Sequence, residues 1–177
     1  GNLIVRKKPT RQTKDTKKIM IAAHMDEIGL MVSHVDEKGF IRFSPLGGVF
    51  RRYVAGGRVR FLNGVQGVIG YENLSNVNEL PMLDKVYIDV GATSKKDCPV
   101  KVGDVAAFDR PFTEMGNRLV AKSMDDRVGV LVAIETLRAL KSTPHDVYFV
   151  FTTQEEVGIR GAATSASRTS TCTAAPR

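Results

Sequence analysis

The 177-residue chain is 42% hydrophobic and 25% charged, which is typical of a globular domain with room for a small second one and excludes a disordered or fibrous protein. Its net charge of +7 is concentrated in residues 1–18, where seven basic residues accompany one acidic residue, Asp15. No aromatic residue lies among these basic ones, so we interpret the segment as a solvated face and expect no nucleic-acid partner.

The two cysteines, Cys98 and Cys172, lie far apart without the spacing of a metal site, which favours a reducing compartment and predicts a cytoplasmic protein. No apolar run approaches 18 residues and no export signal is present, so we expect no membrane span and no membrane partner. The chain opens without Met inside a predicted strand, residues 2–6, and we therefore expect that an amino-terminal segment is missing.

The next predicted strand is the apolar run 19–23, of a kind found in sheets covered on both faces. It leads into His24 and Asp26, whose side chains share one face of an extended segment and can meet. A metal-binding histidine is commonly oriented by such a carboxylate, but the pair is also typical of a plain hydrogen bond. The two interpretations stay open on these residues alone.

Residues 30–35 and 40–43 follow as a predicted β-hairpin, in which His34 is expected to be structural or at the surface. From residue 44 to about 118, glycines accumulate and no helical period is found, which predicts an inserted β-domain resembling a small barrel. Its candidate strands are residues 58–62, 67–70, 85–89 and 104–108. Such a module can bind a partner, a second copy of the chain or nucleic acid, and its edges need covering.

A helix is predicted from about Ser123 to Lys141. Its expected buried side consists of Val128, Leu131, Val132, Ile134, Leu137 and Leu140. Asp125 and Asp126 lie at its amino end, where acidic residues cap free N–H groups and complement the helix dipole. Capping is therefore the alternative to a ligand role for these two residues.

The run 147–151 predicts a short buried strand, and Glu155 and Glu156 come directly after it. In open α/β sheets ligands bind at the edge where the carboxyl ends of the strands lie, which is where these glutamates are expected. Two neighbouring glutamates are, however, also typical of a solvated loop. Together with His24 and an Asp before the helix, they are the ligand types that hold a pair of divalent metal ions. One glutamate can then bind metal while the other, uncoordinated, works as a general acid/base.

Three segments resemble the successive motifs of the tetrahedral (TET-type) dinuclear metallo-aminopeptidases. They are residues 23–29 (AHMDEIG), 122–129 (KSMDDRVG) and 154–161 (QEEVGIRG). That family includes glutamyl and deblocking aminopeptidases, and some members carry an endoglucanase label. The similarity extends in order from residue 1 to about 166, including the β insert.

The resemblance implies a role for each site residue. His24 is a ligand of one metal ion, Asp26 orients it, and Asp125 bridges both ions. Glu155 is the general acid/base and Glu156 a ligand of the second ion, with Asp126 and Arg127 as supporting neighbours. The implied cofactors are two divalent ions (zinc, cobalt or manganese), and the implied substrate is a peptide that loses its N-terminal residue.

The implied fold is an α/β sandwich with a mixed central sheet, similar to the zinc peptidases. Residues 1–43 and 119–166 are expected to form part of the catalytic domain, and residues 44–118 a β-barrel-like insert. The insert mediates dimers within a hollow dodecamer in this family, so a homo-oligomer is expected.

The chain departs from the family near its end. The family has one further Asp ligand and a last His ligand, yet no Asp, Glu or His follows Glu156 here. The tail, residues 167–177, also lacks the expected strand pattern, so we expect a chain truncated at both ends with a tail from a shifted or misassigned reading frame. With three of five ligands, it should bind metal weakly and show little or no activity.

Two other functions stay open. One is an inactive protein that only assembles through its β insert. The other is glycoside hydrolysis, which needs two carboxyl groups facing each other across a sugar, roughly 5 to 9.5 Å apart. Glu155 and Glu156 are chain neighbours and make a poor pair for that reaction.

Overall fold

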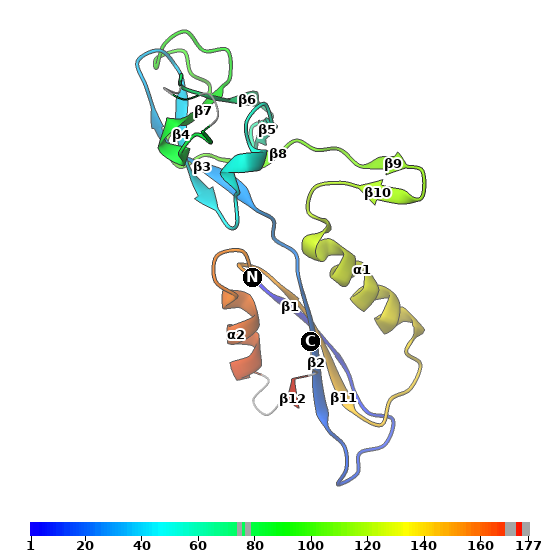
Figure 1. Ribbon diagram of the computed structural model, residues 1–177. Coiled ribbons are helices and arrows are strands. Elements are labelled where there is room, and N and C mark those ends of the chain that lie inside the picture. The colour runs from blue at the N-terminus through cyan, green and yellow to red at the C-terminus, as the bar shows by residue number, and fades with distance from the viewer. Residues whose placement is uncertain (74–75, 77–78, 169–172, 175–177) are drawn as a thin grey trace. The chain divides into compact units, whose positions relative to one another are not determined.

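The computed structural model describes residues 1–73, 76, 79–168 and 173–174 (Figure 1). The chain divides into two compact units. Residues 1–27 and 123–177 form the first, which we call the α/β unit, and residues 28–122 form the second, the barrel unit. The range 44–118, in which the sequence predicts a β insert, falls entirely inside the barrel unit.

The α/β unit is built on a mixed four-stranded sheet, as predicted, with the order β1-β11-β2-β12. The strands are β1 (Leu3–Lys7), β2 (Lys18–His24), β11 (Asp146–Thr152) and β12 (Thr173–Ala174). β1 runs antiparallel to β11, whereas β11 and β12 run parallel to β2. Because β2 and β11 are parallel neighbours, the residues that follow both strands emerge at the same edge of the sheet.

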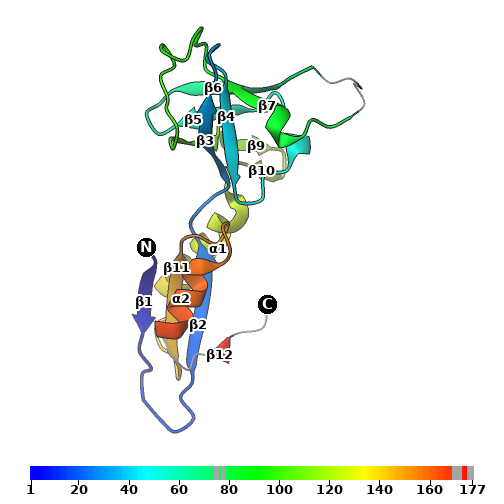
Figure 2. The ribbon, with the colours of Figure 1, turned by 90° about the vertical axis from the view of Figure 1, so that its left-hand side faces the viewer.

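Two helices cover this sheet, α1 (Met124–Ala139) and α2 (Arg160–Arg168), and they lie on opposite faces of it (Figures 1 and 2). The core beneath α1 joins Ala133 to Val147, Phe149 and Phe151 of β11. The alternation along β11 explains this arrangement, since residues two apart on a strand point to the same face. This is the α/β sandwich that the sequence predicts.

The predicted buried side of α1 is partly wrong. Ile134, Leu137 and Leu140 pack against the core as expected, together with Val130. Val128, Leu131 and Val132 are instead 46%, 57% and 58% exposed. α1 has apolar residues on two opposite sides, and a single sheet face can bury only one of them.

The barrel unit consists of six antiparallel strands closed in the order β3-β4-β7-β6-β5-β8. They are β3 (Gly29–Val35), β4 (Ile41–Leu46), β5 (Arg58–Phe61), β6 (Gln66–Tyr71), β7 (Val86–Asp89) and β8 (Val105–Phe108). The remaining elements of this unit are the 3₁₀ turns η1 (Arg51–Tyr53) and η2 (Leu83–Lys85) and the paired strands β9 (Thr113–Met115) and β10 (Arg118–Val120). The sequence predicts strands whose exposed edges would need covering. In the closed barrel each of the six strands pairs on both sides, so no edge is left among them.

The boundaries of the insert differ from the predicted range 44–118. The hairpin over residues 30–43 belongs to the barrel rather than to the α/β unit. β3 pairs with β8 and β4 pairs with β7, so the hairpin is needed to close the barrel. Gly29, the last residue of the first motif, shows how tight this closure is, because a Cβ there would lie 2.9 Å from the Ala106 carbonyl oxygen.

Most of the tail, including Cys172, lies outside the described residues. The expectation that it has no strand is wrong at Thr173 and Ala174, which pair with Ile19 and Met20 of β2. Pairing of this kind uses only backbone groups at the edge of β2, so it needs no particular side chains. Within the described ranges no helix is long and apolar enough to cross a bilayer.

Candidate metal centre

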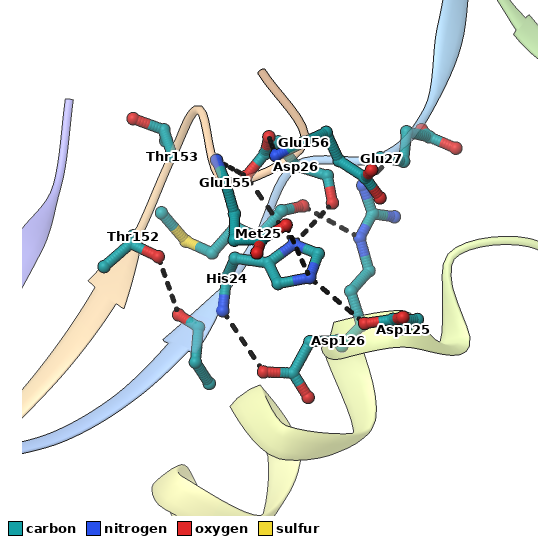
Figure 3. A network of polar contacts seen from close by, with 12 residues as sticks. His24, Met25, Asp26, Glu27, Asp125, Asp126, Thr152, Thr153, Glu155 and Glu156 are labelled. Carbon is teal, nitrogen blue, oxygen red and sulfur yellow. Dashed lines mark hydrogen bonds and ion pairs between the residues drawn. The ribbon is translucent and has the colours of Figure 1, made fainter. Parts of the chain in front are cut away.

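His24 stands at the end of β2, beside Thr152 at the end of β11, and is only 8% exposed. Its Nδ1 atom lies 3.1 Å from the backbone oxygen of Asp26 and 3.6 Å from Oδ1 of that carboxylate (Figure 3). A carbonyl oxygen can only accept, so Nδ1 carries the proton in this bond. In the neutral ring the lone pair is then on Nε2, the atom that faces the other site residues.

Carboxylates surround Nε2 of His24. Oδ1 of Asp125 lies 3.1 Å away and Oε2 of Glu155 lies 3.8 Å away. Burial lowers the pKa of His24, but the bonds to Asp125 and the Asp26 backbone and the charges of Glu155 and Asp26 outweigh it and raise that pKa above its ordinary value. The folded ring therefore keeps its second proton to a higher pH than a free imidazole does.

The two neighbouring aspartates of α1 have different contacts. Oδ1 of Asp126 accepts the N–H of Gly129 at 3.1 Å, which caps the helix, and Oδ2 accepts the backbone N–H of His24 at 3.3 Å. The Asp125 side chain is 92% exposed and its carboxylate faces Nε2 of His24. Capping thus belongs to Asp126, which leaves Asp125 available as a ligand.

Glu155 and Glu156 follow β11 at the same sheet edge. The carboxylate of Asp26 accepts both of their backbone N–H groups, with Oδ1 taking that of Glu155 and Oδ2 that of Glu156, each at 3.2 Å. His24, Glu155 and Glu156 each offer one potential ligand atom, and these three atoms lie within 4.8 Å of one another. Figure 3 shows the side chains gathered around the imidazole ring.

A further set of contacts joins the end of β2 to the start of α1. Ser123 Oγ donates to Glu27 at 2.6 Å, and Arg127 contacts both Glu27 at 3.5 Å and the Met25 backbone oxygen at 3.2 Å. Sequence reasoning missed Glu27 and Ser123 as supporting residues. The available signal was their place inside the first two motifs, but nothing in the sequence links positions 96 apart.

The donor set fits a divalent metal ion. Imidazole nitrogen and carboxylate oxygens are ligands that zinc, cobalt and manganese accept. Among the described residues, one group of His, Cys and acidic side chains converges this closely. Asp125 adds a carboxylate next to the histidine of that group.

The chain matches the family model described as M42 glutamyl aminopeptidase over residues 1–175. The chain belongs to the M42 family. The resemblance seen in the three motifs is therefore confirmed.

Three proteins illustrate the similarity. A relative from Acetivibrio thermocellus is 48% identical over 169 residues, which are 94% of this chain and 49% of that protein. The solved structure of aminopeptidase APDkam598 from the archaeon Desulfurococcus kamchatkensis has a TM-score of 0.88 at 45% identity, covering 98% of this chain and 50% of that one. The Pyrococcus horikoshii TET1 peptidase has a TM-score of 0.79 at 34% identity, covering 94% of this chain and 52% of that one. The chain thus spans about half the length of the proteins it matches.

Proposed function

We propose that this chain supplies part of a metal-dependent aminopeptidase site, which releases N-terminal residues from peptides. The observation that carries the proposal is the convergence of His24, Glu155 and Glu156 within 4.8 Å at one edge of the sheet. M42 membership supports it and favours peptide hydrolysis over both alternatives, glycoside hydrolysis and a role in assembly alone.

The proposed ligands are His24, Asp125 and Glu156, and the proposed cofactors are two divalent ions, zinc, cobalt or manganese. Bound there, such ions polarise the scissile carbonyl and lower the pKa of the attacking water. His24 is prepared for this role because the Asp26 backbone holds the proton on Nδ1 and leaves Nε2 facing the carboxylates. Asp125 reaches the same nitrogen from the start of α1.

Glu155 is the proposed general acid/base. Its Oε2 lies 3.8 Å from His24 Nε2, close to the ligands, and its side chain is 37% exposed, so water and substrate can reach it. A carboxylate placed there takes the proton from the attacking water and passes it to the leaving amine. The carboxylate of Asp26 accepts the backbone N–H groups of Glu155 and Glu156. These bonds fix the backbone positions from which the two glutamate side chains extend.

We also propose that the complete protein forms homo-oligomers through its barrel unit. The matched P. horikoshii TET1 peptidase assembles into a tetrahedron or a large octahedral shell. The cytoplasm is the proposed location, in keeping with the free thiol of Cys98.

The experiment is an assay of N-terminal residue release from short peptides, with and without added Co²⁺. It compares the chain alone with a form in which the carboxyl-terminal half of the D. kamchatkensis aminopeptidase follows residue 166. We expect little or no turnover from the chain alone and metal-dependent turnover from the joined form. Glu155→Gln in the joined form should lower kcat by about 10² to 10⁴.

The matched control is Glu135→Gln, an exposed glutamate of α1 that contacts Arg138. It should leave turnover unchanged. Turnover by the joined form that does not require Glu155, or no metal-dependent turnover at all, contradicts the proposal.

A further inference from the structure

Asn2 precedes β1, yet its side chain contacts residues more than 150 positions away. Oδ1 accepts the backbone N–H of Thr153 at 3.0 Å. Nδ2 donates to the Gly161 carbonyl at 2.7 Å and to Ser165 Oγ at 2.6 Å, with Thr164 Oγ1 further away at 3.5 Å. A carboxamide has one acceptor oxygen and two N–H donors, so the side chain of Asn2 is fully used.

These contacts join the two ends of the loop that carries Glu155 and Glu156. Thr153 is the residue after β11, and Gly161 lies in the first turn of α2. A Cβ on Gly161 would collide with the Thr153 carbonyl oxygen and lie 2.7 Å from Oδ1 of Asn2. The two ends of the loop are therefore packed directly on each other and on Asn2.

The loop needs such support because its backbone is strained. Gln154 and Ile159 both have positive φ, 63° and 56°. Non-glycine residues in this region cost on the order of 1–3 kcal/mol each and persist only where their surroundings hold them. Inside the loop, the Glu155 carbonyl accepts the N–H groups of Gly158 and Ile159, which closes a tight turn directly after the first glutamate.

The loop is thus held from two sides. Asp26 holds it at the backbone of Glu155 and Glu156, and Asn2 holds its two ends. We propose that Asn2 is a positioning residue for Glu155 and Glu156, which keeps their carboxylates directed at His24 although it contacts neither. This inference rests on the proposed function for its consequence in metal binding.

The first test is a Co²⁺ titration of the chain, followed by the visible absorption of the bound ion. Asn2→Ala should weaken Co²⁺ binding by about 10- to 100-fold, the range found when residues that orient metal ligands are removed. The Co²⁺ affinity of Asn2→Asp should lie between those of Asn2→Ala and the unchanged chain. This variant keeps the acceptor for the Thr153 N–H but loses the donors to Gly161 and Ser165. Should Asn2→Ala fail to fold, Asn2→Asp carries the test alone.

The matched control is Arg6→Ala. Arg6 lies on β1, the strand that Asn2 precedes, and its guanidinium donates to Asp146 at the opposite end of β11, away from the loop. We expect its Co²⁺ affinity to stay within about twofold of the unchanged chain. If Arg6→Ala weakens binding as much as the Asn2 variants, general loss of stability explains the effect and the inference is overturned.

The second test separates this inference from the proposed function. Amide hydrogen exchange reports on the loop without any metal, and Asn2→Ala should accelerate exchange at Glu155, Glu156 and Ile159 but not in the barrel unit. If the unchanged chain binds no Co²⁺, the proposed function fails and exchange alone decides the role of Asn2. Exchange and Co²⁺ affinity both unchanged in the Asn2 variants overturn the inference.

Discussion

The two units of this chain are stabilised in different ways. Among the residues that the structure describes, the barrel unit closes on itself around fourteen buried apolar side chains. The α/β unit buries four in the core beneath α1 and leaves Leu131 and Val132 more than half exposed on the helix. The candidate site lies in the unit with the smaller core, so its geometry depends on polar contacts made by Asp26, Asp126 and Asn2. In the barrel, by contrast, the apolar side chains fill one closed core.

The largest effect that tests this comparison is expected from Ile88→Ala in the barrel. Ile88 is fully buried on β7, where it pairs with β4 and β6. Truncation leaves a cavity and should lower the free energy of unfolding of the barrel by about 2–5 kcal/mol. Urea denaturation monitored by amide exchange in the barrel measures it. A loss below about 1 kcal/mol would mean that the core relaxes around the gap.

A smaller loss is expected from Gly161→Ala in the α/β unit. The added methyl group has no room beside Thr153 and Asn2, so overpacking should cost about 1–3 kcal/mol and weaken Co²⁺ binding. Gly48→Ala is the control, since a Cβ there meets nothing within 4 Å. Equal free energies of unfolding for the two variants in urea would show that the residues around Gly161 shift to accommodate the methyl group without a loss of stability.

The third effect is a dependence of stability on pH. Arg6, helped by the Tyr148 hydroxyl, lowers the pKa of Asp146 in the folded α/β unit against the opposing effect of burial. A lowered folded pKa means that the stabilisation is present above the unfolded value of about 3.9 and is lost as the pH falls through the folded pKa. We expect a loss of about 1 kcal/mol below about pH 4, kept small because Arg6 is half exposed.

Asp146→Asn should remove that acid-dependent step. Urea denaturation between pH 2 and pH 7 measures it in both proteins. An unchanged dependence on pH in the variant would assign the step to other carboxylates.

The smallest effect is expected from Leu131→Ala. This residue has an apolar side chain like Ile88 but is 57% exposed, so its truncation should change stability by less than about 0.5 kcal/mol. A cost near that of Ile88→Ala in the same denaturation experiment would show that the outer side of α1 is buried in solution.

The strands and the barrel could be predicted because alternating and apolar runs report directly on extended segments. The meeting of His24 with Glu155 and Glu156 could be anticipated too, since the ends of parallel strands share a sheet edge. The hairpin over residues 30–43 could not be assigned, because its alternation says nothing of β7 and β8, the partners it pairs with. Likewise, the helical period did not reveal which of the two apolar sides of α1 faces the sheet.

Local pattern alone did not separate the roles of neighbouring residues, although the family resemblance implied that Asp125 is the bridging ligand and Asp126 a supporting neighbour. Asp125 and Asp126 are chemically identical, and only their contacts separate the capping residue from the one that faces His24. Nothing in the sequence around Asn2 indicates that it supports the loop, because its hydrogen-bond partners lie more than 150 positions away. Each of these distinctions depends on contacts across the fold rather than on local pattern.

The most direct test of the central claim is a Co²⁺ titration of four proteins: the chain itself and its His24→Ala, Glu156→Gln and Glu155→Gln variants. Loss of a ligand weakens binding, whereas loss of an uncoordinated acid/base leaves it in place. We predict at least tenfold weaker binding for His24→Ala and Glu156→Gln, and affinity within a few-fold of the unchanged chain for Glu155→Gln. Equal losses for Glu155→Gln and Glu156→Gln, or no binding by the unchanged chain, would contradict the proposed division of roles.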